Sequence, residues 1–280
     1  MTKPPPAREF VAQGFGKTLV RLALLVGGAL ASGCAEDPAP EQIIDVSRWL
    51  YRNYATASDE RMAEAVVALA GSVTAVTADN PFKGLIGSLK AGDNAVVGRT
   101  GVDPTKTVGM MVVTEFNCKL AQVEKIHSAA DQNALHPSAY TAYKRTFRQS
   151  RDEYLARKFN QLDWDTELTS DYASEKLDGS LRFIADLGKA KSPYGAALVS
   201  RTWLKENAVA VASATEWQQD YQVEAYFERT PGKVVHLFAV WRQAQFMGLS
   251  NESTTLQNLQ FGGFVDWDKE VEKACASGKF

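Results

Sequence analysis

The sequence is poor in the residues on which most recognisable catalytic and metal sites depend. Its 280 residues include only three cysteines and three histidines. A structural zinc site needs four ligands in close pairs, so the wide spacing of the cysteines excludes one. Basic and acidic residues nearly balance, at 31 and 33, and no basic run is present. This balance argues against a nucleic-acid partner. No apolar run approaches the ~20 residues that a membrane-spanning helix needs.

An N-terminal leader is the clearest feature that is present. The first 21 residues carry four basic residues and one acid, and the uncharged run Leu22–Leu30 follows. A basic segment, a short apolar run and an exit of small residues are typical of a secretory signal. The exit Ala31-Ser32-Gly33-Cys34 resembles the lipobox of bacterial lipoproteins, although leucine is commonest where Ala31 stands. The resemblance implies cleavage after Gly33 and lipidation of Cys34, whose acyl chains would hold the protein on a membrane.

Two other interpretations of the leader stay open. One is an ordinary secretory signal cleaved after Ala31 or Gly33, which would leave Cys34 as a free thiol. The other is a buried helix with an incidental cysteine, although the two glycines inside the apolar run weaken helix formation. If Cys34 is lipidated, Ala35 stands where an aspartate would favour inner-membrane retention in enteric-type sorting. We therefore expect a protein of the cell envelope, anchored to the outer membrane.

Pattern and composition divide the chain into five segments. Residues 1–33 are the expected signal peptide, and residues 34–41 form an acidic, proline-spaced tether. Apolar residues at helical spacing predict a helical hairpin over residues 42–80. Residues 81–107, rich in Gly, Asp, Asn and Pro, are expected to be a linker before an α+β domain over residues 108–280. Without the leader, 27 basic residues face 32 acidic ones, so the remaining chain is mildly acidic.

The predicted linker invites comparison with a phosphate-binding loop because it combines several glycines with a lysine. Leu89 precedes Lys90, where that motif requires glycine, and Ala91 stands where a magnesium-binding hydroxyl is required. We therefore interpret the segment as a connector without a phosphate site.

Residues 108–280 combine strand and helix patterns in an order typical of an α+β fold. We expect an antiparallel sheet because the strands follow one another through short turns, of which the Pro-Gly turn in RTPGK is the best supported. The expected elements are a buried strand over 108–116, a helix over 120–130, a half-buried strand over 162–168, a hairpin joining 197–204 to 208–214, a second hairpin joining 221–228 to 234–241, and a closing helix over 264–278.

This order of elements resembles the START-like helix-grip fold, in which a curved antiparallel sheet wraps a C-terminal helix around a hydrophobic cavity. The resemblance covers residues 108–278 and depends on element order alone, so it carries over no binding residue. The chain is also similar to uncharacterised envelope lipoproteins of predatory or soil proteobacteria, a likeness that implies no activity.

Histidine chemistry has few candidates. Glu124 and His127 have the i,i+3 spacing of half a di-metal site on a helix, but the second copy that such a site requires is absent. We therefore interpret Glu124 as solvated and His127 as a residue at the helix flank. His136 lies beyond that helix, and His236, within VVHLFAVW, is expected to be a satisfied sheet residue.

An acidic cluster is the other candidate for chemistry. Alternation places Asp163, Asp165 and Glu167 on one face of a strand, and Asp171 follows. Paired carboxylates can cleave glycosidic bonds and acidic loops can bind calcium. Calcium loops usually contain glycine, which this stretch lacks, so we interpret it as a polar outer face. We expect neither a metal nor another cofactor.

Aromatic residues crowd the strand region. Core packing is their ordinary role, but a cavity lined by some of them would suit an apolar ligand. They are Trp203, Trp217, Tyr221, Tyr226, Phe227, Phe238 and Trp241.

The two remaining cysteines lie near the two ends of the α+β domain. Cys118 follows its first strand, and Cys275 lies on the apolar face of its last helix. An exported protein can form disulfides. A Cys118–Cys275 bridge and two separately buried thiols both stay open.

Three functional hypotheses follow. The first is a lipid-anchored module that binds or carries an apolar small molecule or lipid. The second is a structural or assembly lipoprotein whose hairpin docks a protein partner in the envelope. An enzyme ranks last because no catalytic constellation is present. A large enclosed apolar cavity between the sheet and the closing helix would favour the first hypothesis over the second.

Overall fold

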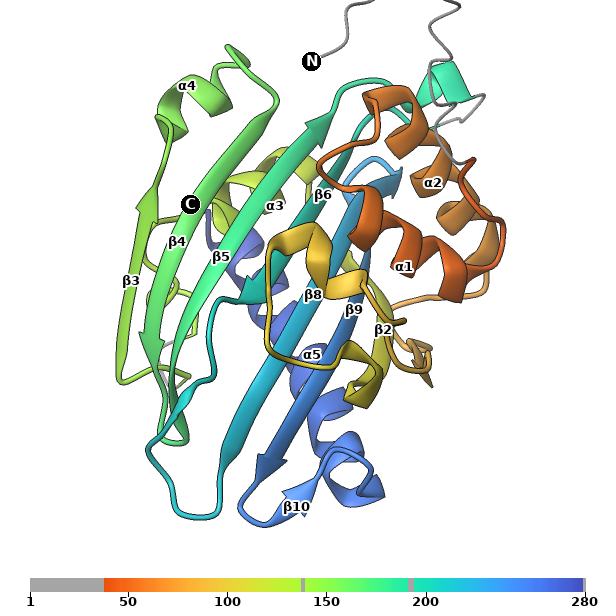
Figure 1. The fold of residues 1–280 in the computed structure, drawn as a ribbon. Helices are drawn as coiled ribbons and strands as arrows, with labels where there is room; N and C mark the ends of the chain where they lie inside the picture. The colour runs from red at the N-terminus through yellow and green to blue at the C-terminus, as the bar shows by residue number, and fades with distance from the viewer. Residues whose placement is uncertain (1–37, 137–138, 191–193, 279–280) are drawn as a thin grey trace, which may run out of the picture. The chain divides into compact units, whose positions relative to one another are not determined.

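The computed structural model describes residues 38–136, 139–190 and 194–278, so the predicted signal peptide and Cys34 lie outside the described residues. Within these residues, a ten-stranded antiparallel sheet has the order β1-β2-β9-β8-β6-β5-β4-β3, while β10 pairs with β9 and β7 with β5 (Figure 1). The prediction of an α+β fold with a large antiparallel sheet and a C-terminal helix is confirmed. The strands are β1 (Phe82–Leu85), β2 (Val108–Asn117), β3 (Ala142–Phe147), β4 (Gln161–Thr169), β5 (Ala173–Ile184), β6 (Ala197–Leu204), β7 (Val209–Ala210), β8 (Glu216–Thr230), β9 (Lys233–Phe246) and β10 (Leu249–Ser250).

Helices cover both faces of the sheet (Figure 1). α1 and α2 pack on one face, called here the α1 face, and α3 and α5 pack on the opposite face, called the α5 face. Among the described residues, no helix is both long and apolar enough to cross a membrane. The helices are α1 (Ile43–Asn53), α2 (Asp59–Ser72), α3 (Leu120–His127), α4 (Arg151–Leu155) and α5 (Thr254–Ser277), with 3-10 turns η1 (Asp93–Val97), η2 (Pro104–Lys106) and η3 (Leu187–Ala190).

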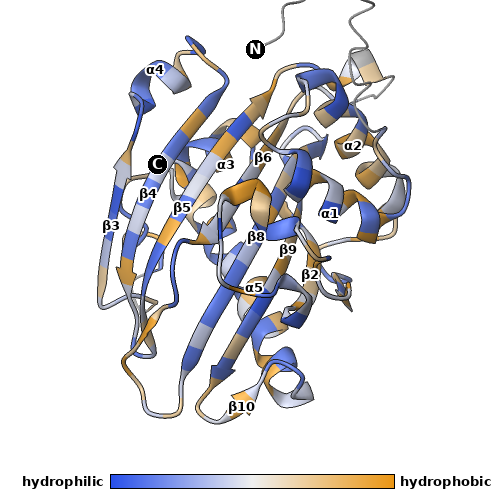
Figure 2. Cartoon of the chain, in the orientation of Figure 1, coloured by the Kyte–Doolittle hydropathy of each residue, from blue (hydrophilic) through white to orange (hydrophobic). Residues whose placement is uncertain are grey.

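Side-chain alternation along the strands explains the two layers, because successive residues of a strand point to opposite faces. In β8, Tyr221 and Val223 belong to the core of the α1 face, whereas Tyr226 belongs to the core of the α5 face. α1 and α2 are amphipathic (Figure 2) and bury their apolar residues in the α1-face core, among them Leu50 and Leu69. The α1 face is therefore a filled hydrophobic core.

One predicted hairpin is wrong. β6 pairs with β5 and β8, not with residues 208–214, of which only Val209–Ala210 forms a strand, paired with β5. The alternating valines of this segment satisfy a strand pattern, but Val209 and Val211 are exposed and no layer covers them. Apolar residues therefore alternate here with a period of two, but they lack the burial that normally accompanies this pattern in a strand.

The closing helix is longer than predicted. α5 begins at Thr254, ten residues before the expected start at residue 264. Gly262 and Gly263 lie inside it. Because paired glycines weaken a helix, the predicted helix begins only after them, at residue 264. The helix ends as predicted at Gly278, which is left-handed with φ 63°.

The segment predicted as a linker contains ordered structure. β1 pairs with β2 within it, and the buried Asp93 accepts a hydrogen bond from the backbone N–H of Lys90 at 2.7 Å. Asp93 also lies 3.1 Å from Nε of Arg52 on α1. The described residues belong to one compact unit. The division into a hairpin, a linker and a sheet domain stays a prediction.

Candidate functional site

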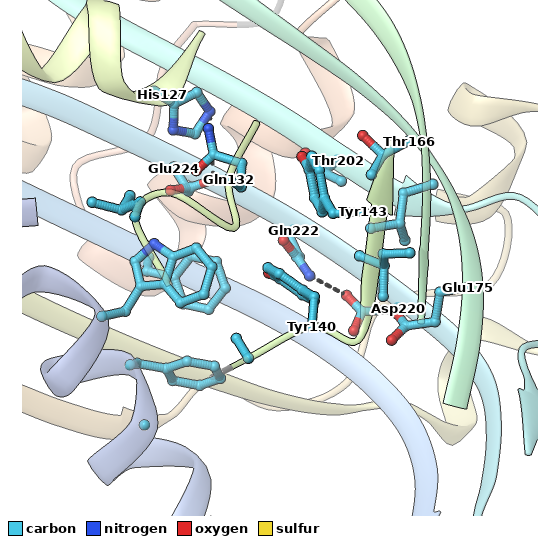
Figure 3. Close-up of a pocket in the computed structure, with 18 of the residues that line it drawn as sticks. His127, Gln132, Tyr140, Tyr143, Thr166, Glu175, Thr202, Asp220, Gln222 and Glu224 are labelled. Carbon is cyan, nitrogen blue, oxygen red and sulfur yellow. Dashed lines mark hydrogen bonds and ion pairs between the residues drawn. The ribbon is translucent and has the colours of Figure 1, made fainter. Parts of the chain in front are cut away.

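A cavity of about 510 Å³ lies on the α5 face, between the sheet, α3 and α5. Small-molecule sites generally enclose ~300–1,000 Å³, so its size suits a small organic ligand. Side chains from several strands converge on it (Figure 3). Ten of its described lining residues are aromatic: Tyr140, Tyr143, Trp164, Tyr172, Trp217, Tyr226, Phe238, Phe246, Phe264 and Trp267.

One wall of the cavity is a face of α5. Gly263, Phe264, Trp267 and Val271 line it, and residues spaced by three or four positions share one side of a helix. Ring centroids of Phe264 and Phe238, on β9, lie 4.6 Å apart. The helix that closes the fold therefore also closes the cavity.

The opposite wall is the sheet, where a row of polar residues follows β8. Asp220, Gln222 and Glu224 alternate with buried apolar residues and line the cavity, as Figure 3 shows. Gln222 Nε2 donates to Asp220 Oδ1 at 2.8 Å. The cavity therefore combines aromatic and aliphatic walls with polar groups from several elements, of which the row on β8 is one set.

An ion cluster lies at the centre of this arrangement. His236 on β9 lies between two carboxylates, with its Nδ1 2.7 Å from Asp268 Oδ1 and its Nε2 3.2 Å from Glu224 Oε2. Thr114 Oγ1 donates to Asp268 Oδ2 at 2.5 Å, and the Tyr226 hydroxyl donates to Glu224 at 2.5 Å. The cluster ties α5 to β2, β8 and β9.

The charges of the cluster stabilise one another. Burial lowers the pKa of His236, but Asp268 and Glu224 outweigh burial and raise it to about 9. Burial likewise raises the pKa of Glu224, yet the histidines His127 and His236 and the Tyr226 hydroxyl bring it down to about 2. At neutral pH, His236 is therefore a cation.

His127 extends the cluster from α3. Its Nε2 lies 3.0 Å from Ser200 Oγ and 4.0 Å from Glu224 Oε1. Burial lowers its pKa to about 4 despite the nearby Glu224, so the ring is neutral at pH 7. A Ser–His–acid triad needs serine and carboxylate on different ring nitrogens. Here Ser200 and Glu224 approach the same nitrogen, so these residues do not form a triad.

A second polar group lies farther along β8. Arg242 Nε donates to Asp220 Oδ2 at 2.7 Å, and its guanidinium lies 4.5 Å from the Trp217 ring. Glu175 on β5 faces this pair and makes no hydrogen bond or ion pair with the described residues. Burial, together with Asp220, raises the pKa of Glu175 to about 7 although Arg242 opposes the rise. Glu175 is therefore the cavity carboxyl that is free to bond a ligand.

The interpretation of Glu124 is wrong. Its side chain is buried, not solvated, because the chain after α4 brings Arg157 onto it, with nitrogen–oxygen distances of 2.8 and 2.6 Å. His127, on the same helix, contacts Ser200 instead, so the two residues do not share a ligand. His136 is buried and stacks on Trp267. The described residues contain no group of three or more His, Cys, Asp or Glu side chains that could hold a metal ion.

His236 occupies a sheet position with partners, as expected, but the partners come from β8 and α5. Sequence reasoning missed Asp268, Glu224 and Asp220. An alternation of acids with apolar residues over 220–227 is the signal that could have found the last two, because it places carboxylates on one face of a long buried strand.

The acidic cluster of β4 lies away from the cavity. The even-numbered residues of β4 from Leu162 to Leu168 are buried, while Asp163 and Asp165 are half-buried and Glu167 is exposed. Asp163 accepts from Ser180, and Asp165 pairs with Arg148. Asp171 is exposed in the turn that follows. The interpretation as a polar outer face is confirmed.

The predicted aromatic cluster divides between the two faces. Trp217, Tyr226 and Phe238 line the cavity. Those that pack instead in or against the α1-face core are Trp203, Tyr221, Phe227 and Trp241.

A disulfide joins the ends of the α+β region. Cys118, directly after β2, is bonded to Cys275 in the last turn of α5, with a Cα–Cα distance of 5.6 Å. The bond therefore fixes the C-terminal end of α5 to the sheet, while the cavity lies along the rest of the helix.

Comparison with known proteins gives no functional assignment. No protein-family model matches this chain, and no curated protein matches it. Among solved structures, it is similar to the lipid transfer and protein localization domain of human StarD13 (DLC2), with 14% identity over 69% of this chain and 90% of that one and a TM-score of 0.37. It is also similar to human STARD10, with 9% identity over 60% and 63% and a TM-score of 0.38. A STAR-related lipid transfer protein from Xanthomonas axonopodis matches with 9% identity over 64% and 89% and a TM-score of 0.37.

Proposed function

We propose that the folded domain binds an amphipathic small molecule in the α5-face cavity, and that the protein is held in the cell envelope by a lipid on Cys34. The cavity supports the first part of the proposal, the binding of a small molecule. Its size and aromatic lining suit an apolar body, and the carboxyl of Glu175, which has no partner among the described residues, suits one end with a hydrogen-bonding group. The order of basic, apolar and small residues before Cys34 supports the second part.

The arrangement of α1 and α2 does not favour the assembly hypothesis. Their apolar residues are already buried against the sheet, so these faces are not free to dock a protein. Catalysis has no supporting geometry among the described residues either, since Ser200 and Glu224 approach the same nitrogen of His127. Ligand binding is therefore the function that the described residues support best.

Native mass spectrometry of purified protein tests whether a ligand is carried. We expect a bound apolar molecule that organic solvent releases. Titration with a fluorescent fatty-acid analogue then locates the site. Thr202→Phe fills the cavity from β6, so we expect it to reduce binding at least about tenfold.

A matched control places the same side chain outside the cavity. Thr146→Phe changes an exposed threonine of β3 that does not line the cavity, and should leave binding unchanged. Equal affinities of the two variants would refute binding in this cavity. Metabolic labelling with a radioactive fatty acid tests the anchor separately, because Cys34→Ala should abolish the label.

A further inference from the structure

Three connections at one end of the sheet carry exposed apolar side chains. They are the β4–β5 turn, the β6–β8 connection and the β9–β10 turn, at the lower end of the sheet in Figure 1. Backbone hydrogen bonds join them, from Val211 N to Tyr172 O at 2.8 Å and from Gly248 N to Ala214 O at 2.9 Å. We call this the loop-end surface; its apolar residues, with exposed fractions of 38–69%, are Tyr172, Val209, Val211, Met247 and Leu249.

The loop-end surface is unusually free of charge. Residues 207–215 read NAVAVASAT and residues 245–251 read QFMGLSN, and neither stretch has a charged side chain. Hydrophobic residues are visible along the β6–β8 connection in Figure 2. Turns that face only water normally carry polar residues, so exposed valines at alternating positions need another explanation. The flanking charges are mixed: Arg99 donates to Asn207 at 2.6 Å and Lys205 is exposed, while the exposed acids are Asp171, Glu206, Glu216 and Glu252.

Met247 occupies a conformation that disfavours it. Its φ is 49° and that of Gly248 is 83°, so both lie in the left-handed region. Tight hairpins of this kind favour asparagine or aspartate at the first position, because a larger side chain is strained there. A strained methionine that is 65% exposed contributes little to folding. Local strain of this kind is typical of a binding surface.

The loop-end surface is continuous with the cavity. Tyr172 and Phe246 line the cavity, and their ring centroids lie 4.4 Å apart. Trp217, another lining residue, lies 6.0 Å from Phe246. A surface that holds this end of the protein against an apolar phase would therefore bring the cavity next to that phase.

We propose that the loop-end surface inserts into the boundary between headgroups and acyl chains of a lipid bilayer. Exposed apolar side chains from three turns at one end of the sheet fit a deformable bilayer interface. A protein partner would need a continuous patch of ~800 Å² with a polar rim. Acids outnumber bases among the flanking charges, which favours an electrically neutral bilayer over an anionic one. This partner goes beyond the proposed function and does not depend on what the cavity binds.

A dye at the tip tests the proposal. Full-length protein with Cys34→Ala and Met247→Cys offers one reactive thiol, since Cys118 and Cys275 are bonded to each other. The matched control carries the dye through Asp152→Cys on α4, at the opposite end of the sheet (Figure 1). With phosphatidylcholine vesicles that contain nitroxide-labelled acyl chains, quenching at position 247 should exceed quenching at position 152 at least about twofold, because only the tip enters the bilayer.

A second variant separates insertion from misfolding. Val209→Asp with Val211→Asp should weaken vesicle binding at least about tenfold, because two apolar side chains no longer enter the bilayer. The near-ultraviolet circular dichroism should not change, since both side chains are exposed. Phosphatidylserine in the vesicles should reduce the quenching at low salt.

Three results would overturn the proposal. The first is equal quenching, or none, at positions 247 and 152. The second is quenching that the two aspartates leave unchanged. The third is a dimer in sedimentation without vesicles that the aspartates dissociate, which would assign the surface to a second copy of the chain. Fatty-acid titration of the Asp variant in solution measures the cavity independently.

Discussion

The two faces of the sheet use the same strands in opposite ways. On the α1 face, β8 and β9 present Val223, Leu237 and Trp241, which are fully buried against α1 and α2. On the α5 face, the alternate positions of these strands present charged residues such as Glu224 and His236 beside a cavity. Filled apolar cores stabilise a fold, whereas cavities and buried charges generally cost stability. The comparison therefore indicates that the α1 face is a filled core, whereas the α5 face combines a smaller core with a cavity and buried charges.

Neighbouring residues of β9 provide the strongest test of this difference. Leu237→Ala removes a fully buried side chain from the α1-face core and should lower the free energy of unfolding by about 3–5 kcal/mol. Phe238 is only half-buried beside the cavity, so Phe238→Ala should cost less than the ~3–5 kcal/mol that a fully buried phenylalanine loses. Urea denaturation of both variants measures the two costs. Equal costs would show that the α5 face is packed like the α1 face.

The ion cluster is the exception on the α5 face, because it should stabilise the fold. Asp268→Leu leaves His236 with one carboxylate partner and removes the bond to Thr114, so we expect a loss of about 3 kcal/mol. Asp268→Asn keeps a hydrogen-bonding group and should lose less. Thermal denaturation ranks the two variants. If Asp268→Leu leaves the stability unchanged, apolar packing alone holds α5 on the sheet.

The cluster also predicts a pH dependence. Because the pKa of His236 is raised to about 9 in the fold, its contribution is complete below its unfolded pKa near 6.5 and is lost as the pH rises through 9. Urea denaturation between pH 6 and 10 should show this loss in the wild type. His236→Gln should flatten the curve in that interval.

Glu175 should change the stability less than His236 does. Its charged form destabilises the fold, whereas the charged form of His236 stabilises it. The raised pKa of Glu175, about 7, means that the fold disfavours the ionised carboxyl. The wild type should therefore lose stability as the pH rises from 4.5 through 7. Glu175→Gln should be more stable than the wild type at pH 8 and similar to it at pH 4. A variant that is less stable at pH 8 would show that the carboxylate has a partner in the fold.

The smallest expected effect concerns α5. A Cβ added at Gly262 would meet no heavy atom within 4 Å, so Gly262→Ala fits without a clash. Alanine favours a helix over glycine by ~1 kcal/mol, and the variant should gain about 0.5–1 kcal/mol of stability. Thermal denaturation would detect the gain. No gain would indicate that this half of α5 is already open in solution.

Local sequence patterns predicted those elements in which the spacing of apolar and polar residues matches their burial in the fold. The Pro-Gly turn between β8 and β9, the buried strand β2 and the outward acids of β4 all follow from residue spacing. The valines of residues 208–214 gave the same pattern without the same burial, because strand pairing is decided by residues far along the chain.

The site was less predictable than the fold. His236 gave no sign that Asp268 is its partner, since the contact joins β9 to α5, which lies 32 residues later in the chain and packs on the sheet. The aromatic residues were visible, but their division between a filled core and a cavity depends on the curvature of the sheet and the path of α5. Glu124 shows the same limit, because its partner Arg157 comes from a turn after α4.

The pairing of β2 with β9 has a consequence for how the chain folds. Asn117 lies opposite Lys233 and Val108 opposite Arg242, so the sheet joins residues more than a hundred positions apart. Contacts between such distant residues slow folding, because a long loop must close before they form. β2 can pair with the nearby β1 early, but it cannot pair with β9 until β9 has been synthesised. The chain must therefore remain without a finished sheet until most of its length has emerged, with its most apolar strands exposed to aggregation meanwhile.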